Sequence, residues 1–416
     1  MRIAVIGAGA AGLMAAAAAG SSGADTTVYE RNDMAGKKLL IAGKGRCNFT
    51  RDCSVQELVE GFEPNGKFLY SALSAFGPTR LCELMVSLGV DYKVERGKRV
   101  FPVSDKASDV RDALLKHALE AGASFAFGRR IARISVDSGR VTGVVDNAGR
   151  PIPYDRVICA TGGASYPGTG STGDGYTMAE QVGHTVSKLF PALVPMETLE
   201  PWSRSLAGLA LRNVELTLMD SGCKVGQEFG EMLFTHTGVS GPIVLSLSRK
   251  VCQAVRHDGV FPPGRFVLSL DLKPALDEPT LTSRVQRDLV AMSKKQLRNS
   301  LDRLMPKALV EHVIREAKVD ETTPANQVTV EQRAALVSVL KGMKITVART
   351  RPLEEAIVTS GGVSTVEVDP RTMESRKVHG LFFAGEVLDI DAPTGGYNLQ
   401  AAFATGRLAG LCAARD

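Results

Sequence analysis

The sequence predicts an α/β protein with a Rossmann-like dinucleotide-binding domain, a β-barrel-like domain and a helical subdomain. Three observations lead to this prediction. A strand–glycine–helix–strand pattern occupies residues 1–30, and a short apolar strand followed by a glycine-led helix occupies residues 381–413. Between them, residues 206–234 alternate apolar and polar side chains, and residues 279–341 have helical periodicity.

The glycine spacing of the first segment is typical of pyrophosphate binding. An apolar strand at Ile3–Ile6 leads into Gly7-x-Gly9-x-x-Gly12 and an alanine-rich helix. Gly7 permits the tight turn, Gly9 lets the backbone approach a pyrophosphate, and Gly12 lets the helix pack closely on the strand. The helix N-terminus adds free N–H groups and the positive end of a dipole.

An acidic residue stands where the nucleotide ribose is expected. The second predicted strand, Thr26–Tyr29, ends at Glu30, which lies 18 residues after Gly12. A carboxylate there accepts hydrogen bonds from ribose hydroxyls and repels a 2′-phosphate. The pattern therefore favours FAD or NAD over NADP.

Composition is that of a soluble globular protein, and no membrane partner is expected. The chain has 416 residues, 44% hydrophobic and 23% charged, without an uninterrupted apolar run long enough to span a bilayer. The net charge of +5 shows no obvious patch in the sequence, and aromatic residues make up only 6%. Both values permit an anionic ligand but do not indicate nucleic acid, so no nucleic-acid partner is expected.

Cysteine and histidine usage indicates a cytoplasmic protein without a metal site. The seven cysteines include no C-x-x-C pair, and the six histidines show no metal-ligand spacing. An odd number of unpaired thiols fits a reducing compartment better than a disulfide framework.

A basic loop is predicted directly after the ribose carboxylate. Residues 36–51 are dense in glycine and cations, including Lys37, Lys38 and Arg46. The loop has to pass the nucleotide, so it is expected to cover the phosphates and the flavin, the alternative being a solvated basic loop. Cys47 within it has no partner cysteine and is expected to be structural.

Regular elements are predicted between this loop and residue 190. They comprise helices in 54–89, a hairpin in 91–101, a helix at 107–121 and strands at 124–127, 130–136, 140–146 and 155–159. The first three of these strands are expected to form a small sheet of their own. The turn after the last strand, Ala160-Thr161-Gly162, is expected to bring backbone close to the cofactor. A second G-x-G-x-x-G at 168–173 does not open from a strand, and we predict a loop that leads into a helix near Asp174.

Prolines near residue 190 mark a domain boundary. A β-domain follows the boundary, and a helical subdomain follows the β-domain. His236 lies in a Thr/Ser-rich turn within FTHTGVSGP. It is either a turn histidine bonded to backbone or an active-site donor.

Several longer motifs resemble one family over essentially the whole chain. They are GKKLLIAGKGRCNFT, FPVSDKASDV, TGGASYPGTGSTGDGY, FTHTGVSGP and GEVLDIDAPTGGYNLQ. Together they resemble the bacterial BaiN-like (YhiN-like) NAD(P)/FAD-dependent oxidoreductases, flavoproteins with two dinucleotide-binding motifs. The resemblance implies FAD as the cofactor and a discontinuous, glutathione-reductase-like FAD-binding domain at residues 1–190 and 344–416. Residues 191–275 would form an inserted β-domain, and residues 276–343 an inserted helical subdomain.

The resemblance also implies a set of cofactor contacts. Those to the pyrophosphate and ribose are Gly7, Gly9, Ala11, Gly12 and Glu30. Those lining the cofactor from the basic loop are Lys37, Lys38, Gly45, Arg46 and Asn48, with Ile131 at the adenine. Those at the ribityl chain and the isoalloxazine are Gly385, Glu386, Asp389, Asn398, Leu399 and Gln400.

The expected function is hydride transfer through flavin N5 in an FAD-dependent oxidoreductase. NAD(P)H-dependent reduction of a small substrate such as a conjugated enone is the first hypothesis, with His236 and Arg46 polarising the substrate or delivering a proton. Because no dedicated nicotinamide domain is visible, NAD(P)H would dock transiently. An amine oxidase that uses oxygen is one alternative. A flavin-containing RNA-associated or regulatory protein is another, raised by the Lys/Arg-rich segment 284–318.

Overall fold

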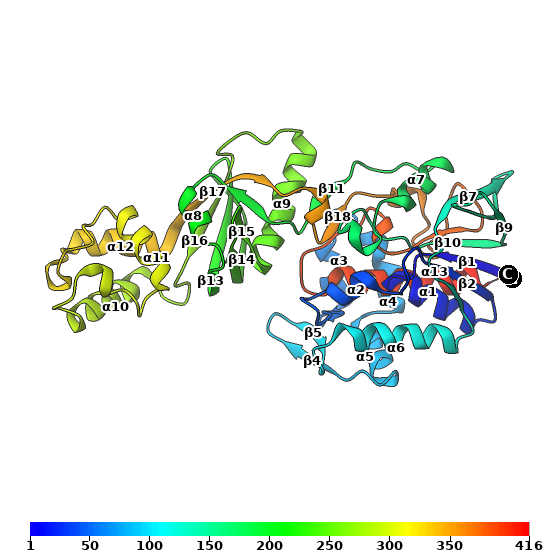
Figure 1. Ribbon diagram of the computed structural model, residues 1–416, viewed down its shortest axis with the longest axis horizontal. Helices are drawn as coiled ribbons and strands as arrows, with labels where there is room; N and C mark the ends of the chain where they lie inside the picture. Colours follow the sequence, from blue (N-terminus) through cyan, green and yellow to red (C-terminus); the bar gives the residue numbers. More distant parts are fainter. Residues whose placement is uncertain (416) are drawn as a thin grey trace. The chain divides into compact units, whose positions relative to one another are not determined.

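The computed structural model describes residues 1–415, which form two compact units (Figure 1). Unit 1 contains residues 1–192 together with the C-terminal part from Leu353, and unit 2 contains residues 193–352. Each unit has its own hydrophobic core. The predicted β-domain and helical subdomain share the core of unit 2.

Unit 1 is built on a parallel five-stranded sheet, which confirms the predicted Rossmann-like α/β fold. The strand order is β19-β10-β1-β2-β6, and all neighbouring pairs are parallel. The strands are β1 (Arg2–Ile6), β2 (Asp25–Tyr29), β6 (Ser124–Ala126), β10 (Arg156–Cys159) and β19 (Leu381–Phe383). From β1 the chain proceeds to β2 on one side and later to β10 on the other, so the topological switch point lies between β1 and β10.

Two small-residue helices pack closely in unit 1. Helix α1 (Ala10–Ser21) is buried along most of its length, and α13 (Tyr397–Ala413) crosses it. A Cβ on Gly406 or Gly410 would collide with a carbonyl oxygen of α1, at Ala11 and Ala15 respectively. Alanine and glycine are therefore needed here because the two backbones are in direct contact.

The other elements of unit 1 follow the predicted order with two corrections. The segment 36–51 is not all loop, because Lys37–Ile41 consists of good helix formers and buries Leu39 as helix α2. Residues 124–126 join the main sheet beside β2, not the small sheet. The small sheet is formed by β7 (Ile131–Asp137), β8 (Arg140–Asp146) and β9 (Pro151–Pro153).

The rest of unit 1 consists of short elements around this sheet. They are β3 (Thr50–Arg51), α3 (Val55–Gly61), α4 (Tyr70–Ala75), α5 (Pro78–Ser87), β4 (Tyr92–Glu95), β5 (Arg99–Pro102), α6 (Ala107–Glu120), α7 (Asp174–Gln181), β11 (Phe190–Ala192) and β18 (Val358–Ser360).

Unit 2 contains a closed six-stranded barrel, as the alternating pattern predicts. Its order is β12-β15-β14-β13-β16-β17. The strands are β12 (Met196–Thr198), β13 (Ala210–Asp220), β14 (Cys223–Phe234), β15 (Gly238–Ser240), β16 (Phe266–Asp271) and β17 (Met343–Thr350). Strand β17 alternates buried and exposed residues and pairs with β16, so it belongs to this barrel, whereas the sequence assigns residues from 344 to the first domain.

Helices cover the barrel. Helix α9 (Pro242–Asp258) packs on β14, and α12 (Val330–Gly342) packs on β16 and β17. Helices α10 (Glu278–Ala291) and α11 (Lys307–Glu316) pack against α12, and Figure 1 shows the three together in yellow. Short helix α8 (Pro201–Ser205) contacts β12 and β15.

One buried aromatic pair makes unit 2 sensitive to acid. The rings of Trp202 and His312 stack with centroids 3.7 Å apart, and His312 is 7% exposed. The guanidinium of Arg315 donates to His312 Nδ1 at 3.2 Å. Burial, with a smaller contribution from the charge of Arg315, lowers the pKa of His312 to about 4.

This lowered pKa predicts a loss of stability in mild acid. The unfolded chain takes up the His312 proton near pH ~6.5, before the folded chain does. Stability is therefore fully present above that pH and is lost as the pH falls toward the folded pKa of about 4. Urea unfolding at several pH values, followed by the fluorescence of Trp202, measures this. His312→Phe should flatten the dependence and exposed His257→Phe should not; equal slopes in both variants would refute the assignment.

Candidate cofactor site

The loops that follow four parallel strands meet at one edge of the sheet in unit 1. These loops begin at Gly7, Glu30, Ala160 and Ala384, after β1, β2, β10 and β19. A Cβ on Gly7 would stand 2.6 Å from the carbonyl oxygen of Ala160, so the loops on either side of the switch point are in contact. This edge is where open α/β sheets bind their ligands.

The three glycines of the first motif have different surroundings. Gly7 has φ +100°, a conformation that side chains disfavour. A Cβ on Gly12 would collide with the carbonyl of Gly7, so Gly12 is required for packing. A Cβ on Gly9 would meet no atom within 4 Å. The open space at Gly9, beside the N-terminus of α1, is therefore the space in which a pyrophosphate fits.

Glu30 is held in place by three N–H groups. It is 8% exposed. Its Oε2 accepts from the Ala8 N–H at 2.9 Å, and its Oε1 accepts from the backbone N–H and the side-chain Nδ2 of Asn32 at 2.9 and 2.8 Å. A carboxylate offers about four acceptor positions, so Glu30 keeps capacity for a ribose hydroxyl.

The second glycine motif lies beside Glu30. Asn32 Nδ2 also donates to the Thr169 carbonyl at 3.0 Å, and a Cβ on Gly170 would stand 2.5 Å from this Nδ2. Arg31 pairs with Asp174 at the start of α7, at 3.2 Å. The loop 168–173 therefore lies next to the Glu30 carboxylate, to which Asn32 connects it. The sequence predicted the loop and the helix after it but gave no sign of this contact.

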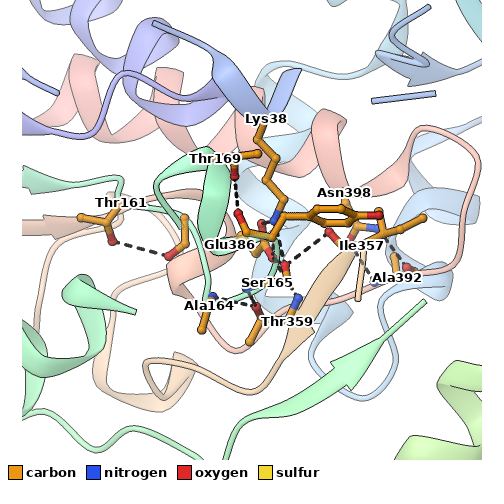
Figure 2. A network of polar contacts seen from close by, with 12 residues as sticks. Lys38, Thr161, Ala164, Ser165, Thr169, Ile357, Thr359, Glu386, Ala392 and Asn398 are labelled. Carbon is orange, nitrogen blue, oxygen red and sulfur yellow. Dashed lines mark hydrogen bonds and ion pairs between the residues drawn. The ribbon is translucent and has the colours of Figure 1, made fainter. Parts of the chain in front are cut away.

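Lys38 and Glu386 join the two ends of the chain at the same edge. Lys38 Nζ donates to Glu386 Oε2 at 2.8 Å and to Ser165 Oγ at 2.9 Å. The Thr359 N–H donates to Glu386 Oε1 at 2.8 Å, while Thr359 Oγ1 accepts from the Ala164 N–H at 2.8 Å. Figure 2 shows Lys38, Ser165 and Thr359 converging on Glu386. Three segments distant in sequence are thereby fixed to the carboxylate of a fourth.

The N-terminus of α13 presents backbone N–H groups. Asn398 holds the preceding loop, because its Oδ1 accepts from the Ala392 N–H at 3.0 Å and its Nδ2 donates to the Ala392 carbonyl at 2.9 Å (Figure 2). The first intrahelical bond is that of the Gln400 N–H to Gly396. The N–H groups of Asn398 and Leu399 have no acceptor within residues 1–415, so they are available to a ligand.

Two predicted contacts have side chains committed elsewhere. Gln400 is fully buried, accepts from Thr50 Oγ1 at 2.6 Å and donates to the Phe76 carbonyl at 2.8 Å. The Arg46 guanidinium pairs with Glu95 at 2.8 Å and Asp105 at 3.3 Å. These contacts hold β3, α4 and the β4–β5 hairpin. We therefore assign neither side chain a contact with the flavin or the substrate.

The remaining predicted residues vary in availability. Lys37 is half-buried and has no carboxylate partner in residues 1–415. Asn48 donates to the carbonyls of Thr50 and Val100, and Asp389 accepts from Ser187 Oγ at 2.7 Å. Ile131 is buried at the start of β7. The other predicted contacts lie at the ligand edge or in the basic segment, namely Ala11, Gly45, Ala160, Thr161, Gly162 and Gly385.

The cysteines near the site are buried. Cys47 is fully buried, and burial raises the pKa of its thiol to about 12. Burial likewise raises the pKa of Cys159, which directly follows β10, to about 11. A thiolate is the reactive form, so the structural interpretation of Cys47 agrees with its surroundings.

His236 belongs to unit 2. It is exposed in the turn between β14 and β15, where the Thr235 N–H donates to the Gly238 carbonyl at 2.8 Å. The turn is closed by Thr235 and Gly238, not by the imidazole. His236 is therefore not needed for the turn, and its role in proton delivery stays a prediction.

The glycine turns, the buried Glu30 carboxylate and the helix ends at the edge of a parallel sheet define a dinucleotide-binding protein of the Rossmann-like class. Residues 1–412 match the HI0933-like protein Rossmann domain, and the chain belongs to this family. No helix within residues 1–415 has the length and hydropathy needed to cross a membrane.

Curated relatives extend over the whole chain. A 3-dehydro-bile acid delta(4,6)-reductase of Clostridium scindens is 32% identical over 415 residues, which cover 99% of each chain. A ribosomal RNA dihydrouridine synthase of Escherichia coli is 33% identical over 96% of this chain and 95% of its own. One of the same name from Haemophilus influenzae is 31% identical over 99% and 98%.

Solved structures share the fold. A 3-ketosteroid delta1-dehydrogenase from Sterolibacterium denitrificans has a TM-score of 0.54 at 14% identity, covering 99% of both chains. The FrdA chain of E. coli quinol fumarate reductase has a TM-score of 0.54 at 20% identity, covering 100% of this chain and 70% of its own. The fold is thus the FAD-binding Rossmann-like fold, and the family relationship makes the protein a flavoprotein oxidoreductase.

Proposed function

We propose that the protein is an FAD-dependent reductase that saturates a carbon–carbon double bond conjugated to a carbonyl. The observation that carries the proposal is the chemistry common to the names of its full-length relatives. One name describes removal of ring double bonds from a 3-keto steroid. The other describes formation of dihydrouridine, in which the uracil double bond next to a carbonyl gains two hydrogens. Both reactions add a hydride and a proton across a polarised alkene.

The residues at the sheet edge fit FAD. The cradle at Gly9 and the N–H groups of α1 would hold the pyrophosphate, Glu30 would accept from the ribose, and the unpaired ammonium of Lys37 would add positive charge near the phosphates. FAD supplies hydride transfer through N5 when bound. The free N–H groups of Asn398 and Leu399 would stabilise negative charge on the flavin ring, as a helix N-terminus does for an anion.

His236 is our candidate for proton delivery. After hydride addition the α-carbon of the substrate needs a proton, and imidazole is the side chain that most often transfers protons in enzymes. His236→Gln is expected to lower turnover by roughly 100-fold to 10,000-fold while leaving FAD affinity unchanged. Loss of FAD affinity with unchanged turnover would contradict this role.

A second candidate substrate is uridine in RNA, in place of a small enone. Two relatives carry the dihydrouridine synthase name. The charge distribution also favours this candidate, because unit 2 has 22 Lys and Arg against 17 Asp and Glu, while the rest of the chain has 28 of each. The net charge of +5, which shows no patch in the linear sequence, therefore belongs to unit 2 alone.

The electron donor is tested by anaerobic stopped-flow mixing of the holoenzyme. We expect NADH or NADPH to bleach the oxidised-flavin band near about 450 nm within seconds. Bleaching by amines alone, followed by fast reoxidation in oxygen, would instead support the amine oxidase and refute the reductase.

Asn32 is expected to support FAD binding without contacting it. Asn32→Ala removes two hydrogen bonds, one of them to the Glu30 carboxylate, and should weaken FAD binding roughly tenfold, since a bond to a charged group contributes about 1.5–3 kcal/mol. Fluorescence titration of FAD with apoprotein measures the affinity. Asn326→Ala, at an exposed asparagine of unit 2, is the control. Unchanged affinity in Asn32→Ala would show that Glu30 is positioned without it.

A further inference from the structure

A hollow on unit 2 is lined by hydroxyl groups and cations. Four of its five lining residues, Thr280, Ser283, Arg284 and Arg287, lie on α10, and Leu276 precedes the helix. The spacing of three, four and seven residues places the four side chains on one face of α10. The hollow has a volume of about 180 Å³. It therefore has room for several water molecules or a small anion.

Two arginines line the hollow, and they differ in their partners. Arg284 Nε donates to the buried carboxylate of Asp288 at 2.8 Å, which neutralises one cation. Arg287 is exposed and has no carboxylate partner within residues 1–415. Half-buried Lys273 also has none in this range, since the nearby carboxylate of Asp271 pairs with Lys341 at 2.5 Å.

The cations influence one another. Burial lowers the pKa of Lys273, and the positive charge of Arg284 lowers it further. Like charges held together beside a hollow destabilise the folded state until an anion neutralises them. The donor set suits an oxyanion, because arginine can donate two parallel hydrogen bonds and Arg284 keeps its Nη groups free of Asp288.

We propose that this hollow, the α10 site, binds a phosphate group through Arg284 and Arg287, with Lys273 adding positive charge beside Arg284. The proposal goes beyond the reductase function, because the α10 site shares no residue with the cradle at the sheet edge. The phosphate belongs either to a free phosphate-bearing molecule or to the backbone of RNA. Exposed cations without carboxylate partners in residues 1–415 continue along the chain after α10, at Lys294, Lys295, Arg303 and Lys307.

Calorimetric titration of the FAD-saturated holoenzyme with inorganic phosphate tests the site at constant ionic strength. Bound FAD occupies the cradle at Gly9, so inorganic phosphate cannot bind there and contribute to the measured heat. We expect saturable binding by the natural chain. Arg287→Gln and Lys273→Met should bind at least about fivefold more weakly, because each loses one charged interaction with the anion. Arg287→Lys should recover part of the affinity. Exposed Lys318→Gln is the matched control and should bind like the natural chain.

Two results would overturn the α10 site. One is the absence of saturable phosphate binding by the natural chain, and the other is equal affinity in Arg287→Gln and Lys318→Gln. Circular dichroism melting of each variant excludes unfolding as the cause of a loss. Since Arg287 and Lys318 are both exposed, both variants are expected to melt like the natural chain.

The source of the phosphate is distinguished by single-stranded RNA binding at several salt concentrations. If RNA backbone occupies the site, Arg287→Gln should bind RNA more weakly, and the slope of log affinity against log salt should fall by about 0.7, the value for one phosphate contact on a single strand. If RNA affinity and slope are unchanged while inorganic phosphate binding is lost, the ligand is a free phosphate-bearing molecule. If Arg287→Gln weakens neither RNA binding nor inorganic phosphate binding, the α10 site is refuted.

Discussion

Replacing Gly9 with valine is expected to abolish FAD binding while leaving the fold intact. A Cβ at Gly9 meets no protein atom within 4 Å, and its φ of −79° is open to any residue. The valine would instead occupy the space of the pyrophosphate. Loss of several bonds to a charged group, at about 1.5–3 kcal/mol each, predicts at least about 100-fold weaker binding. Fluorescence titration of FAD with apoprotein measures this loss.

Gly12→Ala is the matched comparison. Its Cβ would collide with the carbonyl of Gly7, so the substitution pushes α1 away from β1 and should lower the melting temperature of unit 1 as well as FAD affinity. The two variants thus separate a ligand role from a packing role within one motif. Retention of FAD by Gly9→Val would contradict the cradle, and normal melting of Gly12→Ala would contradict the packing role.

Removing the Lys38 ammonium should have the second-largest effect. Lys38→Met leaves the Glu386 carboxylate, of which 19% is exposed, with donors that are neutral only. A lost hydrogen bond to a charged group predicts destabilisation of about 2 kcal/mol. FAD binding should also weaken, because an uncompensated carboxylate then stands at the phosphate-binding edge. Urea unfolding gives the stability and FAD titration gives the affinity.

The double variant Lys38→Met/Glu386→Gln distinguishes a charge effect from a packing effect. Neutralising both partners removes the unpaired charge, so stability should recover most of the loss seen in Lys38→Met. Strictly additive losses would mean that the two side chains stabilise unit 1 independently. In that case the network in Figure 2 would not be a charge pair in energetic terms.

Local sequence patterns predicted the elements of this fold well. The glycine spacing at Gly7 to Gly12 and the apolar runs around it placed β1, α1 and β2 correctly, because these features follow from backbone geometry. Helix α2 was not predicted, because five residues within a glycine-rich segment are too few to show helical periodicity. Strand β17 was assigned to the wrong unit, since its alternation says that it is a strand and not which sheet it joins.

Long-range polar contacts were beyond the sequence. Arg46 and Gln400 lie in motifs that suggest the cofactor, yet their partners are Glu95, Phe76 and other residues distant in sequence. The contact of Asn32 with Thr169 spans 137 positions, so no local pattern could have indicated it. The distribution of charge could not be predicted either. The excess of Lys and Arg in unit 2 is seen only when residues 193–352 are counted separately from the rest of the chain.

The most direct test of the proposed function is oxidation of the reduced holoenzyme by a candidate substrate without oxygen. Photoreduced enzyme would be mixed anaerobically with a 3-keto-4,6-diene steroid or with ribosomal RNA lacking dihydrouridine. The account predicts that one of them restores the oxidised-flavin band near about 450 nm and yields a product with two added hydrogens. Reoxidation by oxygen alone, with both substrates recovered unchanged, would contradict it.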